Sequence, residues 1–216
     1  GIIKLYLLMN AIEQWLALFV QQIKETPYLE WIGVSFGVLE VFLARANKVW
    51  LYPAGLVSIC VSTYVMFHAG LFAESLLYSY YFVMSVYGWW LWRNQGAAQS
   101  LKITFATTQD WKKVGMIVVG GFVILYGILS QFTPSTVPIW DSAVSCTAWA
   151  GMWLLANRKV ENWILLNISN IMAIPLLFHK DLALYASLTT FLFVVAIQGY
   201  FAWKKVAQTT QYISSI

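Results

Sequence analysis

Apolar segments separated by short polar breaks run along almost the whole chain. A helix that crosses a bilayer needs about 20 mostly apolar residues. Seven segments approach or reach this length, at residues 29–44, 49–69, 72–92, 114–132, 139–156, 162–178 and 182–203. The pattern therefore predicts an all-α, polytopic membrane protein with seven transmembrane helices.

The stretch before the first of these segments is apolar but interrupted by polar side chains. These are Asn10, Glu13, Gln14, Gln21 and Gln22. Such a pattern favours an amphipathic helix lying in the membrane interface over an eighth span. The stretch has neither a basic start nor a small-residue cleavage site, so we do not interpret it as a signal peptide.

Composition agrees with the pattern. Hydrophobic residues make up 60% of the chain and charged residues 10%, whereas roughly a quarter of the residues in a typical globular protein are charged. So few charges cannot cover a water-facing surface, which excludes an ordinary soluble domain. Cys60 and Cys146 both lie inside apolar segments, which is typical of packing thiols rather than a disulfide framework.

The basic residues predict the orientation in the membrane. Ten of the 13 Lys and Arg residues lie on the side that holds the loops after the first, third, fifth and seventh segments: Arg45, Lys48, Arg93, Lys102, Lys112, Lys113, Arg158, Lys159, Lys204 and Lys205. The other side holds Lys4, Lys24 and Lys180. The positive-inside bias places the N-terminus outside and the C-terminus in the cytoplasm. The net positive charge is thus explained by membrane topology. The sequence has no stripe of basic residues of the kind that would indicate nucleic-acid binding.

An internal repeat appears when the second and third segments are aligned, without a gap, with the sixth and seventh. Lys48-Val49 then falls on Lys159-Val160, Phe67-His68 on Phe178-His179, Gly88 on Gly199 and Trp92 on Trp203. An even number of spans separates the copies, so both run in the same direction. The repeat predicts a 3+1+3 arrangement with substrate bound near the bilayer midplane, between the halves.

This arrangement divides the chain into five parts. They are an interfacial segment (1–27), a first three-helix repeat (28–93), a linker with a connecting helix (94–133), a second three-helix repeat (134–205) and a cytoplasmic tail (206–216).

The sixth predicted span carries the densest group of polar residues. Trp163, Asn167 and Asn170 have i, i+4, i+7 spacing and share one helical face. An indole and two carboxamides can stack a flat ring and hydrogen-bond its substituents. The same residues would also serve as hydrogen-bonding contacts between helices, and spacing alone leaves both interpretations open.

Three further residues are candidates for substrate contact. Glu40 lies well inside the first span, where a charge is costly; it would be a counter-charge for a cation or a partner in a structural salt bridge. Gln198 faces either other helices or substrate. Tyr87 belongs to an aromatic run that ends in an interfacial belt but whose inner members can line a pathway. Such rings would attract a cationic ligand.

Several motifs are missing from the sequence. It has no phosphate-binding loop of the Gly-x-x-x-x-Gly-Lys-[Ser/Thr] type. It has no cluster with metal-ligand spacing and no nucleophile–base arrangement. We therefore expect neither an enzyme, such as a lipid-modifying one, nor a bound metal or cofactor, nor pumping driven by ATP.

Several motifs together resemble the PnuC family of bacterial vitamin-precursor transporters. They are Pro-Ile-Trp-Asp-Ser (138–142), Arg-Lys-Val-Glu-Asn-Trp-Ile-Leu (158–165), Asn170, Gly-Tyr-x-x-Trp (199–203) and, in the first half, Tyr-Gly-Trp-Trp-x-Trp (87–92). The family's substrate motif, Trp-x-x-Trp-Asn-x-x-[Asp/Asn], matches at Trp163, Asn167 and Asn170. Leu166 replaces its second Trp.

The resemblance implies a multi-pass protein of the bacterial inner membrane with the helix arrangement of SWEET sugar transporters. It also implies a homotrimer, and facilitated diffusion of nicotinamide riboside, a small cationic aromatic vitamin precursor, with a cytoplasmic kinase that traps the product. Relatives carry thiamine or riboflavin, so thiamine is the alternative substrate. A sensor or scaffold subunit is the alternative from another class.

Overall fold

The computed structural model describes residues 2–68, 72–94, 102–179, 181 and 183–214. The helices are α1 (Ile2–Glu25), α2 (Tyr28–Arg45), α3 (Leu51–His68), α4 (Phe72–Arg93), α5 (Thr108–Phe132), α6 (Pro138–Ala156), α7 (Asn162–His179) and α8 (Ala183–Ser214). Within the described part of the chain, the only β contact is an isolated bridge between Thr104 and Lys159. The fold is thus all-helical, as predicted; Lys180 and residues 95–101 of the predicted linker lie outside the described residues.

Each of the seven predicted apolar segments coincides with one helix, from α2 to α8, but two boundaries differ. Helix α5 begins at Thr108 rather than at 114 because a capping box starts it: Asp110 N donates to Thr107 Oγ1 at 3.3 Å, and Thr107 N donates to Asp110 Oδ2 at 2.8 Å. Helix α8 continues past 203 to Ser214. Much of the predicted tail is therefore helical.

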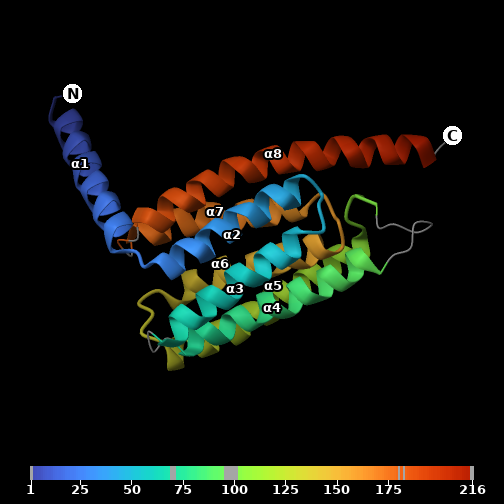
Figure 1. Cartoon of the computed structure of the whole chain (residues 1–216), viewed down its shortest axis with the longest axis horizontal. Coiled ribbons are helices and arrows are strands. Elements are labelled where there is room, and N and C mark those ends of the chain that lie inside the picture. The colour runs from blue at the N-terminus through green and yellow to red at the C-terminus, as the bar shows by residue number, and fades with distance from the viewer. Residues whose placement is uncertain (1, 69–71, 95–101, 180, 182, 215–216) are drawn as a thin grey trace.

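Helices α2 to α8 form an elongated bundle, and α1 projects from one end of it (Figure 1). Helix α2 packs against α3 and α3 against α4, while α6 packs against α7 and α7 against α8. The two groups of three meet where α2 contacts α8 and where α4 contacts α6. Helix α5 packs on α6 and touches α4.

The turn after the first helix of each group has the same geometry. Lys48 N donates to Leu43 O at 2.9 Å, and Lys159 N donates to Leu154 O at 2.9 Å, at the equivalent place in the second copy of the repeat. Asn47 and Arg158 both have positive φ, at 54° and 50°. The internal repeat is thus visible in backbone hydrogen bonds as well as in sequence.

Length and apolar composition allow three of the described helices to cross a membrane: α5, α7 and α8. Helices α1 and α2 pass this test only as a pair, bent by 109° at the break between them. Helix α2 contains Glu30, Glu40 and Arg45 within its 18 residues, which makes it unusually polar for a span. The predicted count of seven spans therefore stays a prediction.

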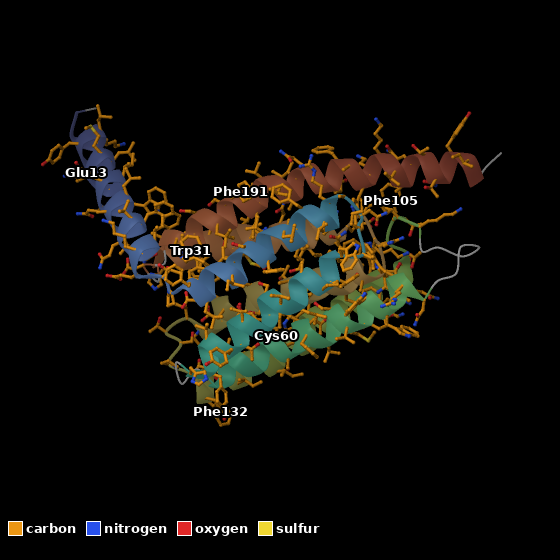
Figure 2. All side chains as sticks on the ribbon, viewed as in Figure 1. Glu13, Trp31, Cys60, Phe105, Phe132 and Phe191 are labelled. Carbon is orange, nitrogen blue, oxygen red and sulfur yellow. The ribbon has the colours of Figure 1, made fainter. Side chains whose placement is uncertain are left out.

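Helix α1 stands apart from the bundle, with side chains spread around it (Figure 2). Its exposed apolar side chains include Leu5, Leu7, Leu8, Met9, Ile12, Leu16, Val20 and Ile23. Near its end it is held to the start of α8, because Leu184 N donates to Gln22 Oε1 at 2.8 Å. Trp15 also packs near Phe178 of α7, with ring centroids 6.4 Å apart.

Candidate functional site

A cavity of about 690 Å³ lies between the two groups of helices. Helices α2, α3 and α4 line one side of it, and α6, α7 and α8 line the other. Neither α1 nor α5 contributes a lining residue. The size suits a small organic ligand.

The wall is mostly apolar, with a limited set of polar groups. The polar and aromatic lining residues are Glu30, Glu40, Ser58, Ser62, Tyr78, Tyr81, Trp163, Asn170 and Tyr185. No Lys, Arg or His is among the described residues that line it. The cavity therefore favours a neutral or cationic ligand over an anion.

Glu40 lies in the cavity wall on α2, with its carboxylate against Gly55 of α3. Within the described part of the chain, no hydrogen-bond donor or cation bonds to this carboxylate. Arg45, the nearest basic residue along α2, donates instead to Gln198 Oε1 at 2.6 Å. The salt-bridge interpretation of Glu40 thus finds no partner among these residues, and the counter-charge interpretation remains.

Trp163 lines the cavity from the first turn of α7 and is 2% exposed. Its ring lies directly over Gly199 of α8, where a Cβ atom would come within 2.7 Å of Cε2 of the indole. Its Nε1 has no hydrogen-bond acceptor among the described residues. A buried donor without a partner is costly, so this unpaired N–H needs a functional or structural reason.

Asn170 lines the cavity, whereas Asn167 does not. The two side chains are nevertheless connected, because Asn170 Nδ2 donates to Asn167 Oδ1 at 3.3 Å. Leu166, the residue that departs from the family motif, does line the cavity.

Gln198 and Tyr87 lie outside the cavity wall. Gln198 is exposed and accepts the hydrogen bond from Arg45, which joins α2 to α8. Tyr87 is 37% exposed. The structure thus brings Glu40, Trp163 and Asn170 together, and it places the other three candidates elsewhere.

Two tyrosines of α4, Tyr78 and Tyr81, line the cavity. Both belong to the aromatic run whose inner members can line a substrate pathway. Their spacing along α4, however, does not distinguish them from the other aromatic residues of that run. Tyr185 is not a candidate from the sequence; its hydroxyl donates to Glu30 Oε2 at 3.2 Å, between α8 and α2. No local pattern predicts this long-range pair.

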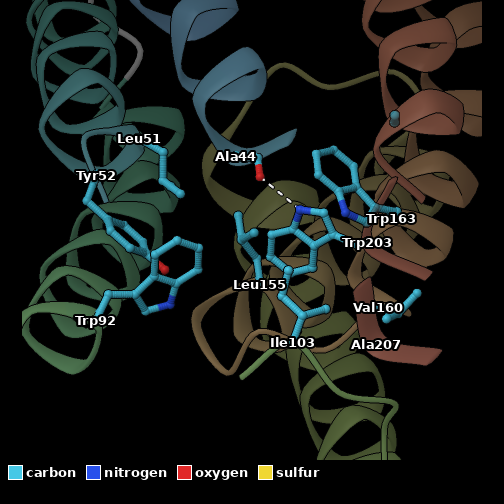
Figure 3. Packing of buried hydrophobic residues seen from close by; sticks show 11 residues of the cluster. Ala44, Leu51, Tyr52, Trp92, Ile103, Leu155, Val160, Trp163, Trp203 and Ala207 are labelled. Atoms are coloured by element: carbon cyan, nitrogen blue, oxygen red, sulfur yellow. Dashed lines mark hydrogen bonds between the residues drawn. The ribbon is translucent and has the colours of Figure 1, made fainter. Parts of the chain in front are cut away.

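An indole cluster, formed by Trp92, Trp163 and Trp203 with Tyr52, lies at one end of the cavity (Figure 3). The buried residues around it include Ala44 and Leu155, which line the cavity as Trp163 does. Each helix group contributes one pair of aromatic rings to the cluster, at equivalent positions of the repeat. Tyr52 meets Trp92 edge-on at 5.2 Å between centroids, and Trp163 meets Trp203 edge-on at 5.8 Å.

Two indole N–H groups of this cluster cross between the helix groups. Trp92 Nε1 on α4 donates to the carbonyl of Ala156 on α6 at 2.9 Å. Trp203 Nε1 on α8 donates to the carbonyl of Ala44 on α2 at 3.0 Å, as the dashed line in Figure 3 marks. Each group therefore holds the last turn of the other group's first helix.

A strap of residues 102–107 packs across the same end. Its Ile103 is 3% exposed and belongs to the buried cluster. Thr104 N donates to Arg158 O at 3.1 Å, and Ala106 N donates to Glu161 Oε2 at 2.7 Å. The strap is thus fixed to the loop between α6 and α7.

Arg158, in that loop, places its guanidinium carbon 3.9 Å from the Trp92 ring centroid. Partial burial lowers the pKa of the Arg158 guanidinium, and the nearby Tyr52 phenol acts in the opposite direction. Arginine begins from so high a pKa that it keeps its charge. The contact is therefore a cation–π interaction that supports the cluster.

Comparisons with known proteins agree with this architecture. The crystal structure of the vitamin B3 transporter PnuC superposes with a TM-score of 0.68 at 22% sequence identity, covering 92% of this chain and 90% of that one. The nicotinamide riboside transporter PnuC of Escherichia coli (strain K12) is 24% identical over 176 residues, which cover 69% of this chain and 74% of that protein; its Shigella flexneri counterpart gives the same values. The family model described as nicotinamide mononucleotide transporter matches residues 27–205. This chain belongs to that transporter family.

Proposed function

We propose that this protein carries nicotinamide riboside across the bacterial inner membrane by facilitated diffusion, and that it binds its substrate in the 690 Å³ cavity near the bilayer midplane. The observation that carries the proposal is the cavity wall. It combines an unpaired carboxylate, Glu40, with an indole, Trp163, and a carboxamide, Asn170. The relatives named above as nicotinamide riboside transporters support the choice of substrate.

The charge of the wall supports the riboside over the mononucleotide that names the family. Nicotinamide riboside carries one positive charge on a flat aromatic ring. The mononucleotide adds a phosphate, which proteins usually bind with Arg, Lys or backbone N–H groups. The described lining residues include Glu30 and Glu40 but no basic side chain, so the phosphate would lie near like charge.

Each polar group has a role in this proposal. The Glu40 carboxylate faces the pyridinium charge, and the Trp163 ring stacks on the flat heterocycle. The free Trp163 N–H and the Asn170 carboxamide hydrogen-bond the ribose or the amide. Asn167 supports Asn170 through the hydrogen bond between them.

The repeat supports the 3+1+3 arrangement of seven spans. The matching turns at 43–48 and 154–159 end the first helix of each group with the same hydrogen bonds. Helix α5 then connects the groups, α1 lies in the interface, and the indole cluster faces the cytoplasm with the C-terminus. Release into the cell would require Trp92 and Trp203 to give up their bonds to the opposite group.

Two features of the sequence support passive transport: it has no nucleotide-binding motif and no evident cluster of carboxylates that would bind a coupling ion. Net uptake then depends on a cytoplasmic kinase that phosphorylates the product. The family resemblance also supports a homotrimer, which light scattering on the detergent-solubilised protein would measure.

Thiamine is the second candidate substrate. It is also a flat cation, and Leu166 in place of the family's second Trp removes one stacking surface from the wall. Riboflavin is neutral, so it would gain less electrostatic attraction from the Glu40 carboxylate.

Binding and flux measurements test the proposal. Calorimetric titration should give tighter binding of nicotinamide riboside than of thiamine, and at least tenfold weaker binding of the mononucleotide. In proteoliposomes, labelled riboside should equilibrate without accumulating, and it should accumulate only when a kinase and ATP are enclosed. Accumulation of unmodified substrate that an uncoupler abolishes would contradict passive transport. Binding without flux would favour a sensor.

A further inference from the structure

The crossing of the first two helices differs between the two groups at one pair of positions. In the alignment of the repeat, positions 40 and 55 of the first group correspond to 151 and 166 of the second. In the first group the large residue is Glu40 and the small one is Gly55. In the second group the order is exchanged, because Gly151 is small and Leu166 is large.

Both glycines make room for the large residue of their pair. A Cβ atom at position 55 would lie 2.5 Å from Oε1 of Glu40 and 2.6 Å from its Cδ. A Cβ atom at position 151 would lie 2.9 Å from both Cδ2 and Cγ of Leu166. These distances are far below ordinary contact, so neither position tolerates a methyl group with its neighbour in place.

The equivalent contact between the second and third helices of each group shows no such exchange. Further along the repeat the small residue occupies the same position in both groups: Gly88 lies under Tyr52, and Gly199 lies under Trp163. The exchange at 40/151 and 55/166 places a carboxylate in one wall of the cavity and an isobutyl group in the other, since Glu40 and Leu166 both line it.

We propose that Gly55 is a positioning residue, which seats the Glu40 carboxylate in the cavity wall and thereby gives the protein its preference for cationic ligands. Gly55 does not line the cavity itself. A glycine within a helix destabilises it relative to alanine, so its presence in α3 calls for a packing reason. The three atoms nearest to the added Cβ all belong to the Glu40 carboxyl group. This inference rests on the proposed function, because it assumes that a ligand occupies the cavity.

A purely structural role for Gly55 would have a different signature. Gly33 and Gly37 of α2 also face α3, but their nearest neighbours are Val61 and Ser58. At position 55, in contrast, the conflict is with the end of a flexible side chain. Gly55→Ala should therefore displace the carboxylate while it leaves the helix packing largely intact.

The test compares two ligands of nearly equal size. Nicotinamide riboside has a fixed positive charge, and its dihydro form is neutral. The measured quantity is the ratio of the two dissociation constants, by titration of monodisperse protein. Glu40→Ala and Gly55→Ala should each reduce the preference for the cation roughly tenfold or more, the size of one charge-assisted contact. The double variant should match Glu40→Ala, because Gly55 acts only through the carboxylate.

Gly151→Ala is the matched control at the corresponding position of the second group. The added methyl group conflicts with Leu166, which is uncharged. The variant should therefore weaken the binding of both ligands alike and leave the ratio of their dissociation constants unchanged. A reduced ratio in Gly151→Ala, or an unchanged ratio in Gly55→Ala beside a reduced one in Glu40→Ala, would overturn the inference while the proposed function stands.

Two remaining outcomes separate the inference from the proposed function. Failure of the wild-type protein to bind either ligand would contradict the proposed function itself. If Gly55→Ala does not fold, the double variant decides: folding restored by Glu40→Ala supports the inference, because the conflict has been removed. Failure of the double variant to fold would overturn it.

Discussion

Trp163 is both part of the buried cluster and part of the cavity wall. Its ring packs on Gly199 and meets Trp203 edge-on, while its N–H has no acceptor among the described residues. Replacement by alanine would remove both the packing and the donor, and large aromatic deletions cost about 3–5 kcal/mol of stability. A ring-preserving substitution is therefore needed to isolate the binding role.

Trp163→Phe should weaken nicotinamide riboside binding roughly five- to 150-fold, the effect of losing one hydrogen bond of about 1–3 kcal/mol. Its unfolding temperature should fall less than that of Trp163→Ala, because a six-membered aromatic ring still fills much of the site. Titration and thermal unfolding of the same preparation measure both quantities. Unchanged affinity would mean that the indole N–H does not contact the ligand.

Asn170 and Asn167 should differ in importance despite their shared helical face. Asn170→Ala removes a group that lines the cavity, whereas Asn167→Ala removes only its hydrogen-bonding neighbour. We expect affinity losses of roughly tenfold or more for Asn170→Ala and several times less for Asn167→Ala. Titration of both variants checks the order. A larger loss in Asn167→Ala would place Asn167, not Asn170, against the substrate.

At the scale of helices, the two groups are joined at one end by reciprocal contacts. The Trp92–Ala156 bond joins α4 to α6, and the Trp203–Ala44 bond joins α8 to α2. On the α2–α8 side, Arg45 and Gln198 add a further hydrogen bond. Alternation between two open states would have to break these contacts at this end and keep the groups together elsewhere.

Trp203→Phe should make the closed end open more often, because it removes one of the two indole hydrogen bonds between the groups. A net loss of about 1 kcal/mol corresponds to a roughly fivefold higher open population. The rate at which a membrane-impermeant thiol reagent labels Leu155→Cys, with Cys60 and Cys146 replaced by alanine, reports this population. Trp90→Phe, which changes an indole that is 59% exposed, is the control and should leave the rate unchanged.

The strap is a second element at the same end, held by Ile103 and by hydrogen bonds to the loop between α6 and α7. Ile103→Ala should destabilise the protein by about 2–5 kcal/mol, as is usual for a buried aliphatic deletion. Lys102→Ala, at the exposed neighbouring position, should have almost no effect. Thermal unfolding in detergent compares the two, and equal shifts would show that the strap contributes little.

At the scale of the whole molecule, the charge distribution predicts the orientation in the membrane. Ten basic residues on one side against three on the other predict a cytoplasmic position for the strap and an external position for the loop between α5 and α6. The indole cluster would then close the inner end of the cavity.

Single cysteines in a cysteine-free background test this orientation. Thr136→Cys, in the exposed loop before α6, should react with an impermeant reagent from outside intact cells. Lys102→Cys should react only after the membrane has been opened. The reverse pattern would invert the topology and place the indole cluster at the outer end.

The sequence by itself determined the helical class and the position of each helix. Long apolar segments leave few alternatives, because backbone polar groups in lipid must be satisfied within a helix. Aligning the chain with itself also revealed the repeat. Equivalent turns need similar residues nearby in the chain, so the repeat leaves a pattern that the sequence shows. Helix α5 begins before the predicted apolar segment, at the Thr107–Asp110 capping box, which the sequence contains but the apolar pattern does not include.

Only the tertiary structure decided which polar residues face the cavity. Helical spacing put Trp163, Asn167 and Asn170 on one face, but the neighbours α6 and α8 determine which part of that face borders the open space. Glu40 has no local partner, and its position depends on Gly55 in another helix. Gln198 is paired with Arg45 by the contact between α2 and α8. Such choices are made by contacts between residues far apart in the chain, and periodicity along one helix contains no information about them.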